Sequence, residues 1–330
     1  MSFKKFKNIK NIVILGYTPL LEDILAINKK LNFNTFLITS PDQKKKIKNK
    51  IQHKVFKSLD INFRNHVKKN FNINSTLFIS FSARWIFNKS IIKFLKNNLI
   101  NFHSARLPFF KGGATFSWQI ISEDRIHNQS IHFVNEKVDG GDIILNNTSI
   151  FPAWCKIPKD YEKYDYSQLK VFYSNFINKI KNEFNFNVVK QSKIFGSYYP
   201  RLYAPKDGWI DWNMNSREIY NFINSMDDPY DGARTTYKKK EIKLKNCHFH
   251  KGNSIKNKFA SGMITKKYDK WIEISCGDGY SLLVCDVLNK NNKSIINKIK
   301  SGERFFTPLK KLFDSKSERT RFGIKGFYRS

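Results

Sequence analysis

Three polar residues in the first half of the chain have the types and spacing that acyl transfer to an amine requires. Asn101 and His103 follow an apolar run, and Asp139 comes 36 positions after His103 (139 − 103). A histidine can take the proton of an attacking amine near neutral pH, and an asparagine amide can donate to a developing oxyanion. A carboxylate beside the histidine fixes its tautomer. These residues form a candidate catalytic set.

Asn101 and His103 can reach one substrate, because side chains two apart on an extended segment point the same way. Taken alone, this spacing is more commonly a hydrogen-bonded structural pair, and that alternative stays open here. Of the other histidines, we expect His53, His66 and His127 to be solvated, since they lie in polar stretches, and His132 to be a core residue of the strand around it.

The elements that must position these residues alternate between strand and helix. The apolar run at 11–15 ends at Gly16, and a helical pattern follows at 20–31. Further strands are expected at 35–39, 77–81, 99–102, 130–135 and 143–150, and a helix from Tyr166. This alternation predicts a parallel sheet with helices on both faces. Ligands of such sheets bind beyond the carboxyl ends of the strands, where Gly16 and His103 lie.

The character of the chain changes near Tyr198. A segment rich in proline and turn residues is followed by a short extended piece, an amphipathic helix and several short strands. This pattern predicts a small β-barrel or sandwich. We therefore expect an α/β protein with a Rossmann-like parallel sheet in a catalytic domain, residues 1–200, and a smaller C-terminal domain, residues 201–330.

The formal net charge is +32, from 59 Lys and Arg against 27 Asp and Glu. A charge this positive is typical of proteins that bind nucleic acid. The excess, however, is mostly lysine spread along an Asn-, Ile- and Phe-rich chain, and this distribution indicates a solvated surface rather than a binding patch. The four cysteines have no CxxC spacing, so we expect no metal site and a reducing compartment. Without a span of 18 apolar residues, we expect a cytoplasmic protein with no membrane partner.

The run NFHSARLPFFKGGATFSW, residues 101–118, resembles the signature of the formyltransferase family, and Asp139-x-Gly141 resembles its second signature at the spacing that the family uses. The resemblance implies that Asn101, His103 and Asp139 are the catalytic triad. It also implies that 10-formyltetrahydrofolate is the formyl donor, a co-substrate. An intact triad argues against a non-enzymatic binding protein.

The resemblance also implies two walls for the folate pterin ring. One wall is the loop after the strand at 77–81 and the other leads to Asp139. The expected cofactor-binding residues are Ala83, Arg84, Trp85, Ile86, Asn135, Lys137 and Val138. The segments 207–212 and 229–233 resemble the C-terminal domain that the tRNA and sugar members of the family share.

Local departures bear on the acceptor. Tyr17 interrupts the Gly-Thr-Pro pattern of the tRNA enzymes, and the segment after Pro41 is too short for their basic loop. The glycine-rich turn at 112–118 looks like the sugar-nucleotide members. The expected substrate-binding residues are Gly16, Tyr17, Thr18, Arg106 and Gly113.

We therefore expect the acceptor to be an amino dideoxy sugar linked to GDP or dTDP, of the kind used in lipopolysaccharide O-antigen biosynthesis. The alternative is a methionyl-tRNA formyltransferase, which the net charge of +32 would suit. We expect no DNA partner, disfavour tRNA, and leave a homodimer possible.

Overall fold

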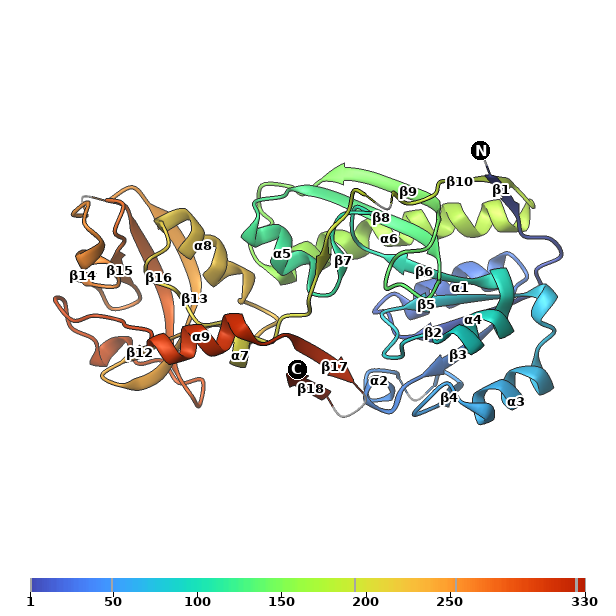
Figure 1. The fold of residues 1–330 in the computed structure, drawn as a ribbon, viewed down its shortest axis with the longest axis horizontal. Coiled ribbons are helices and arrows are strands. Elements are labelled where there is room, and N and C mark those ends of the chain that lie inside the picture. Colours follow the sequence, from blue (N-terminus) through green and yellow to red (C-terminus); the bar gives the residue numbers. More distant parts are fainter. Residues whose placement is uncertain (1, 49, 193, 253, 324–325, 330) are drawn as a thin grey trace.

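A computed structural model describes residues 2–48, 50–192, 194–252, 254–323 and 326–329. Figure 1 shows two sheets with their helices, side by side and joined by the extended segment that leads to α7. The first part of the chain contains β1 Ser2–Lys5, β2 Asn11–Gly16, α1 Leu21–Lys30, β3 Asn34–Thr39, α2 Pro41–Lys44, β4 His53–Val55, α3 Ile61–Asn70, β5 Thr76–Phe81, α4 Lys89–Leu95, β6 Leu99–His103, β7 Lys111–Gly112, α5 Thr115–Ile121, β8 Ile126–Phe133, β9 Ile143–Ile150, α6 Pro158–Lys181, β10 Asn185–Val188 and β11 Tyr198–Tyr199.

The larger sheet has seven strands in the order β4-β3-β2-β5-β6-β8-β9. The first five are mutually parallel, whereas β8 and β9 are antiparallel additions at one edge. The β2 run of isoleucines, valine and leucine is fully buried because helices cover both faces. One core packs α1 and α6 against the sheet, and the other packs α3 and α4. The predicted Rossmann-like parallel sheet is confirmed.

Strand β2 must end in glycine. Gly16 has a φ of +103°, and a Cβ there would lie 2.3 Å from the carbonyl oxygen of Phe81. A glycine with this backbone lets the loop after β2 pass close to β5. This approach brings Thr18 beside the ends of β5 and β6.

Helix α6 begins at Pro158, eight positions before the predicted start at Tyr166. Its first turns carry polar and charged residues, such as Lys159 and Asp160. Asp165, one of them, is buried against the sheet and has internal hydrogen-bond partners. A polar residue that faces inward concealed the apolar stripe at this end of the helix.

The second part of the chain contains α7 Ala204–Asp207, α8 Ser216–Ser225, β12 Ala233–Tyr237, β13 Lys240–His250, β14 Ile264–Lys267, β15 Ile272–Ser275, β16 Ser281–Asn289, α9 Leu309–Ser317, β17 Thr320–Gly323 and β18 Gly326–Arg329. Strands β12 to β16 form an antiparallel sheet in the order β12-β13-β16-β15-β14. The segment 303–306 bridges its two edges. Phe306 pairs with Thr236 of β12, and Arg304 pairs with Met263 just before β14. This bridging closes the sheet into a small barrel around its own core.

Candidate active site

Strand β6 carries Asn101 and His103, and its neighbour β8 places His132 directly opposite Asn101. The Asn101 Nδ2 group donates to His132 Nε2 at 3.1 Å, while His132 Nδ1 donates to the carbonyl of Phe133 at 2.8 Å. His132 thus fixes the orientation of the Asn101 amide. The second amide hydrogen of Asn101 is left for another acceptor.

Asp139 joins the two histidines from the loop after β8. Its Oδ1 lies 3.8 Å from His103 Nδ1 and 3.6 Å from His132 Nε2. Its Oδ2 accepts a hydrogen bond of 2.9 Å from the backbone amide of Gly112. The three predicted catalytic residues therefore lie together at the carboxyl end of β6.

The backbone conformation of the loop that carries Asp139 is fixed by hydrogen bonds and by a close approach to β8. Asp139 has a φ of +50°, and Gln191 Nε2 donates to the carbonyls of Asp139 and Gly141, at 2.8 and 2.6 Å. A Cβ at Gly141 would lie 1.7 Å from the carbonyl oxygen of Phe133. No larger residue fits there, which is the physical reason for the Asp-x-Gly sequence.

The carboxylate of Asp139 stays ionised. Burial alone would raise its pKa, but the charge of a protonated His103 and the hydrogen bond from the Gly112 amide hold the pKa well below its usual value. The other ring nitrogen of His103, Nε2, lies 3.1 Å from the carbonyl oxygen of Phe110. Both ring nitrogens of His103 therefore face oxygen atoms of the protein.

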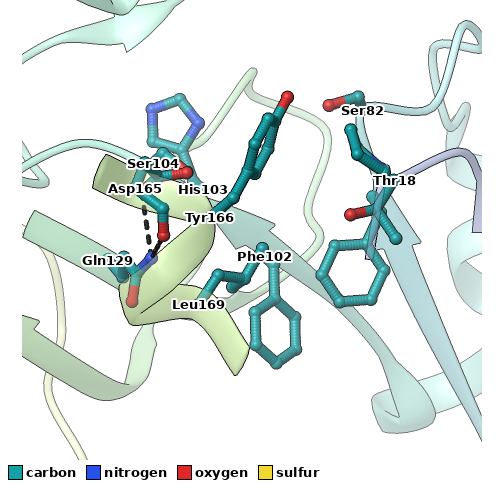
Figure 2. Close-up of a pocket in the computed structure, with 11 residues that line it drawn as sticks. Thr18, Ser82, Phe102, His103, Ser104, Gln129, Asp165, Tyr166 and Leu169 are labelled. Atoms are coloured by element: carbon teal, nitrogen blue, oxygen red, sulfur yellow. Dashed lines mark hydrogen bonds between the residues drawn. The ribbon is translucent and has the colours of Figure 1, made fainter. Parts of the chain in front are cut away.

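A small, partly open pocket lies beside His103 (Figure 2). Its walls come from the loops after β2, β5 and β6 and from α6. The lining residues are Thr18, Pro19, Phe81, Ser82, Phe102, His103, Ser104, Gln129, Asp165, Tyr166 and Leu169. This position beyond the carboxyl ends of parallel strands is where ligands of such sheets bind.

The five predicted substrate residues have different surroundings. Thr18 lines the pocket, Tyr17 precedes it under the ammonium of Lys46, and Gly16 makes the turn beneath them. Arg106 pairs with Asp124 at 3.3 Å. The backbone of Gly113 lies against Arg201 of the linker. Neither Arg106 nor Gly113 is among the residues that line the pocket.

The predicted folate residues lie on two loops that border one hydrophobic cluster. Val134, just before the second loop, and Ala83 of the first loop both pack against this cluster, which contains the buried Trp85. Lys89 at the start of α4 pairs with Glu136 at 3.6 Å. Residues Asn135, Lys137 and Val138 are exposed, as is Ile86, whereas Arg84 pairs with Asp42 at 3.0 Å.

One histidine confirms the sequence prediction and one contradicts it. His132 is buried, as expected of a core residue, and its contacts with Asn101 and Asp139 were not predicted. His127 was expected to be solvated and is fully buried, because its Nε2 donates to Asp165 at 2.9 Å. The register of β8 on β6 could have indicated His132, but nothing near His127 in the sequence points to a partner 38 positions away (165 − 127).

No group of three or more histidine, cysteine or acidic residues within the described part of the chain could hold a metal ion. The helices of that part are also too short or too polar to cross a membrane. All four cysteines are free, and burial raises the pKa of each.

A parallel sheet followed by a small barrel, with an Asn-His-Asp set at the sheet's edge, defines a two-domain transferase architecture. Residues 10–153 match the family model described as formyl transferase, and residues 203–300 match the formyl transferase C-terminal domain. The chain belongs to the formyl transferase family.

Among curated proteins, the chain is similar to the bifunctional polymyxin resistance protein ArnA of Wigglesworthia glossinidia brevipalpis. The two are 26% identical over 290 residues, which are 86% of this chain and 43% of that protein. It is also 25% identical over 214 residues to the methionyl-tRNA formyltransferase of Ruminiclostridium cellulolyticum, covering 62% of this chain and 66% of that one. The match therefore spans less than half of the first relative and just under two thirds of the second.

Two solved structures share the fold, each with a TM-score of 0.64 and 19% identity. One is WlaRD, a sugar 3N-formyl transferase in the presence of dTDP and 5-N-formyl-THF, which covers 86% of this chain and 99% of its own. The other is an N-formyltransferase from Helicobacter canadensis in complex with folinic acid and dTDP-3-aminofucose, which covers 84% of this chain and 99% of its own.

Proposed function

We propose that this protein is an N-formyltransferase that moves a formyl group from 10-formyltetrahydrofolate to the amino group of a nucleotide-linked amino dideoxy sugar. One observation carries the reaction type. Asn101, His103 and Asp139 converge within hydrogen-bonding or ion-pairing reach of shared partners, beside a pocket at the carboxyl edge of the sheet.

Each residue of the set has a distinct task. In the neutral ring, His103 directs its Nδ1 hydrogen to Asp139, and Nε2 is left to take the proton of the acceptor amine. Asn101, oriented by His132, donates its free amide hydrogen to the formyl oxygen as negative charge develops.

The residues present fit a folate. The ring would lie between the loops at 82–86 and 135–138, which carry the exposed apolar side chains of Ile86 and Val138 and exposed backbone. Such loops suit a flat heterocycle that needs apolar faces and main-chain hydrogen bonds. When bound, the group supplies the formyl carbon. The protein's contribution is to hold that carbon near Asn101 and His103 and to take a proton from the amine that attacks it. Relatives of this fold bind 5-N-formyl-THF and folinic acid, which supports the same donor.

The acceptor is inferred from the loops. In the described residues of the connection from β3 to β4 (40–48 and 50–52), the structure has the short helix α2 and turns. The connection is shorter than the tRNA-binding loop expected of the tRNA enzymes. The Gly112-Gly113 turn lets the linker backbone approach, since the Gly113 amide donates to the carbonyl of Tyr199 at 3.2 Å. The relatives that bind dTDP or dTDP-3-aminofucose support a sugar nucleotide. The chain is also similar to a methionyl-tRNA formyltransferase, so charged initiator tRNA is the second candidate acceptor.

One assay separates the two acceptors. Purified protein and 10-formyltetrahydrofolate are incubated with dTDP- and GDP-linked amino sugars or with charged initiator tRNA, and formylated product is measured by mass spectrometry. We expect formylation of at least one amino sugar and none of the tRNA. The two also differ in salt response, since binding of tRNA should weaken with a logarithmic slope of about −0.7 to −0.9 per phosphate contacted. Formylation of tRNA alone would overturn the proposed acceptor and leave the donor unaffected.

A further inference from the structure

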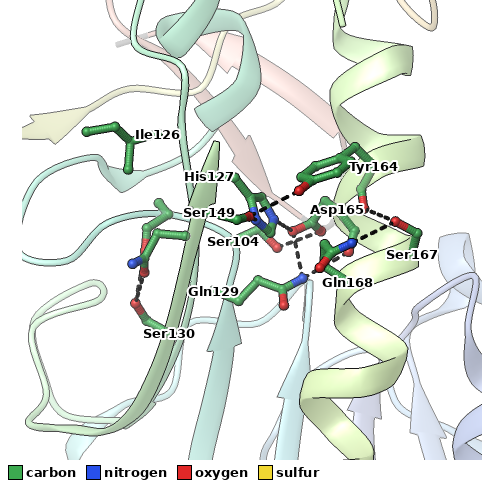
Figure 3. A network of polar contacts seen from close by, with 12 residues as sticks. Ser104, Ile126, His127, Gln129, Ser130, Ser149, Tyr164, Asp165, Ser167 and Gln168 are labelled. Atoms are coloured by element: carbon green, nitrogen blue, oxygen red, sulfur yellow. Dashed lines mark hydrogen bonds and ion pairs between the residues drawn. The ribbon is translucent and has the colours of Figure 1, made fainter. Parts of the chain in front are cut away.

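A buried polar network forms the wall of the pocket beside His103 (Figures 2 and 3). Its centre is Asp165 on α6, which is 2% exposed. The Asp165 carboxylate accepts hydrogen bonds of 2.9 Å from Ser104 Oγ, His127 Nε2 and Gln129 Nε2. Ser104, Gln129 and Asp165 all line the pocket, whereas His127 lies behind them.

Each hydrogen bond of this network is donated in the direction of Asp165, which is the final acceptor. Tyr164 donates its hydroxyl to Ser149 Oγ at 3.2 Å, and Ser149 Oγ lies 2.9 Å from His127 Nδ1. A neutral His127 with its proton on Nε2 satisfies every one of these groups. Because an ionised carboxylate only accepts, the hydroxyl hydrogen of Ser104 is committed to Asp165, and Ser104 presents lone pairs to the pocket.

The charge of the pocket differs from that of the chain. The protein carries a formal net charge of +32, yet none of the residues that line this pocket is a lysine or arginine. Asp165 is the one carboxylate among them. A wall of acceptors with one negative charge favours a cationic donor and disfavours a phosphate.

We propose that Ser104 and Asp165 form the subsite that receives the acceptor's amino group as an ammonium ion. This inference rests on the proposed function. The ammonium carries three hydrogens. One is donated to Ser104, one to the carboxylate of Asp165, and the third faces His103, which also lines the pocket. When His103 takes that third proton, the nitrogen keeps the electron pair of the broken N–H bond and attacks the formyl carbon. As the bond from that carbon to the folate nitrogen breaks, His103 returns its proton to the folate nitrogen. His103 then takes the second proton from the new amide nitrogen and releases it to solvent.

The subsite also explains how an amine is distinguished from a hydroxyl. A hydroxyl has one hydrogen and no charge, so it can satisfy only one of the acceptors around it. A hydrogen bond to a charged group contributes more than a neutral one. The acceptor sugar with an amine should therefore bind at least about 10-fold more tightly than its hydroxyl counterpart.

The test measures this preference directly. Calorimetric titration of the full chain, without folate, compares dTDP-3-aminofucose with dTDP-fucose. We expect wild type to prefer the amine about 10-fold or more and Asp165→Asn, which keeps the shape of the side chain, to lose the preference. Ser104→Ala should reduce it by several-fold, and this variant keeps the test valid if Asp165→Asn fails to fold. The control is Ser149→Ala, at the far end of the network and outside the pocket, which should keep the wild-type ratio.

The outcomes are distinguishable. No binding of either ligand by wild type overturns the proposed acceptor and the subsite with it. Equal binding of both ligands by wild type, or an unchanged ratio in Asp165→Asn or Ser104→Ala, overturns the subsite alone. A rise in affinity for both ligands in Asp165→Asn would assign the pocket to the diphosphate and would also overturn it.

Discussion

The carboxylate of Asp139 lies between two imidazoles, and Asp139→Asn removes its charge with little change of shape. At the 3.8 Å that separates Asp139 Oδ1 from His103 Nδ1, with an effective dielectric constant of about 20, a carboxylate and an imidazolium attract by about 4 kcal/mol. Both side chains are only 11–12% exposed, so solvent screens this attraction weakly. Since the imidazolium forms during the reaction, we expect kcat to fall by about 10²–10³-fold.

The assay is single-turnover formylation of the amino sugar from pH 5 to 9. The Asp139 carboxyl has a pKa below its usual value, so it stays ionised across this range and does not cause the acid limb. Because the Asp139 charge is constant from pH 5 to 9, its loss should lower kcat at every pH of this range. Asp142→Asn, three positions along the same loop, is the control and should keep wild-type kcat. A kcat for Asp139→Asn within threefold of wild type at any pH of this range would refute the assignment.

Three further experiments test the role of His103, the burial of two cysteines and the turn at Gly16. His103→Asn should lower kcat by about 10²–10⁴-fold and leave tetrahydrofolate binding intact by fluorescence titration; retention of half the activity would end its role as base. Burial raises the pKa of Cys155 to about 11 and of Cys276 to about 12, so at pH 8 only about one thiol in 10³ or fewer is ionised and a disulfide reagent should react slowly until the protein is denatured; rapid reaction of either thiol in the folded state would contradict this burial. Gly16→Ala, whose Cβ would lie 2.3 Å from Phe81 O, should lower the free energy of unfolding by about 2 kcal/mol or more. Gly302→Ala shares a positive φ but has nothing within 4 Å, so an equal loss there would show that the clash at Gly16 does not matter.

Much of the fold follows from local sequence. The buried strands β2, β5 and β6 are continuous apolar runs, and Gly16 marks the end of the first because only glycine tolerates its φ of +103° beside Phe81. The barrel could be predicted only as barrel or sandwich, since closure depends on the pairing of residues 303–306 with strands far away in the sequence.

The site was predictable where its residues share a short motif and not where they meet through folding. Asn101, His103 and Asp139 came from two signatures, whereas the Asp165 network joins β6, β8, β9 and α6. A buried carboxylate and a buried histidine each look like surface residues until they are paired, because burial of either alone is unfavourable. For this reason His127 was predicted to be solvated although it is buried, and the start of α6 was predicted at Tyr166 although the helix begins at Pro158.

The segment that closes the C-terminal barrel determines when this barrel can complete its folding during synthesis on the ribosome. Phe306 pairs with Thr236, 70 positions earlier, so β12 emerges from the ribosome long before the backbone that will cover its free edge. At about 5–20 residues per second, that delay lasts several seconds. Until then β12 and β14 expose unpaired amides and carbonyls, which invite pairing with other chains. The larger sheet is complete at β9 and can fold first. We expect the C-terminal half to be the source of aggregation during rapid expression, and slower synthesis to raise the soluble yield.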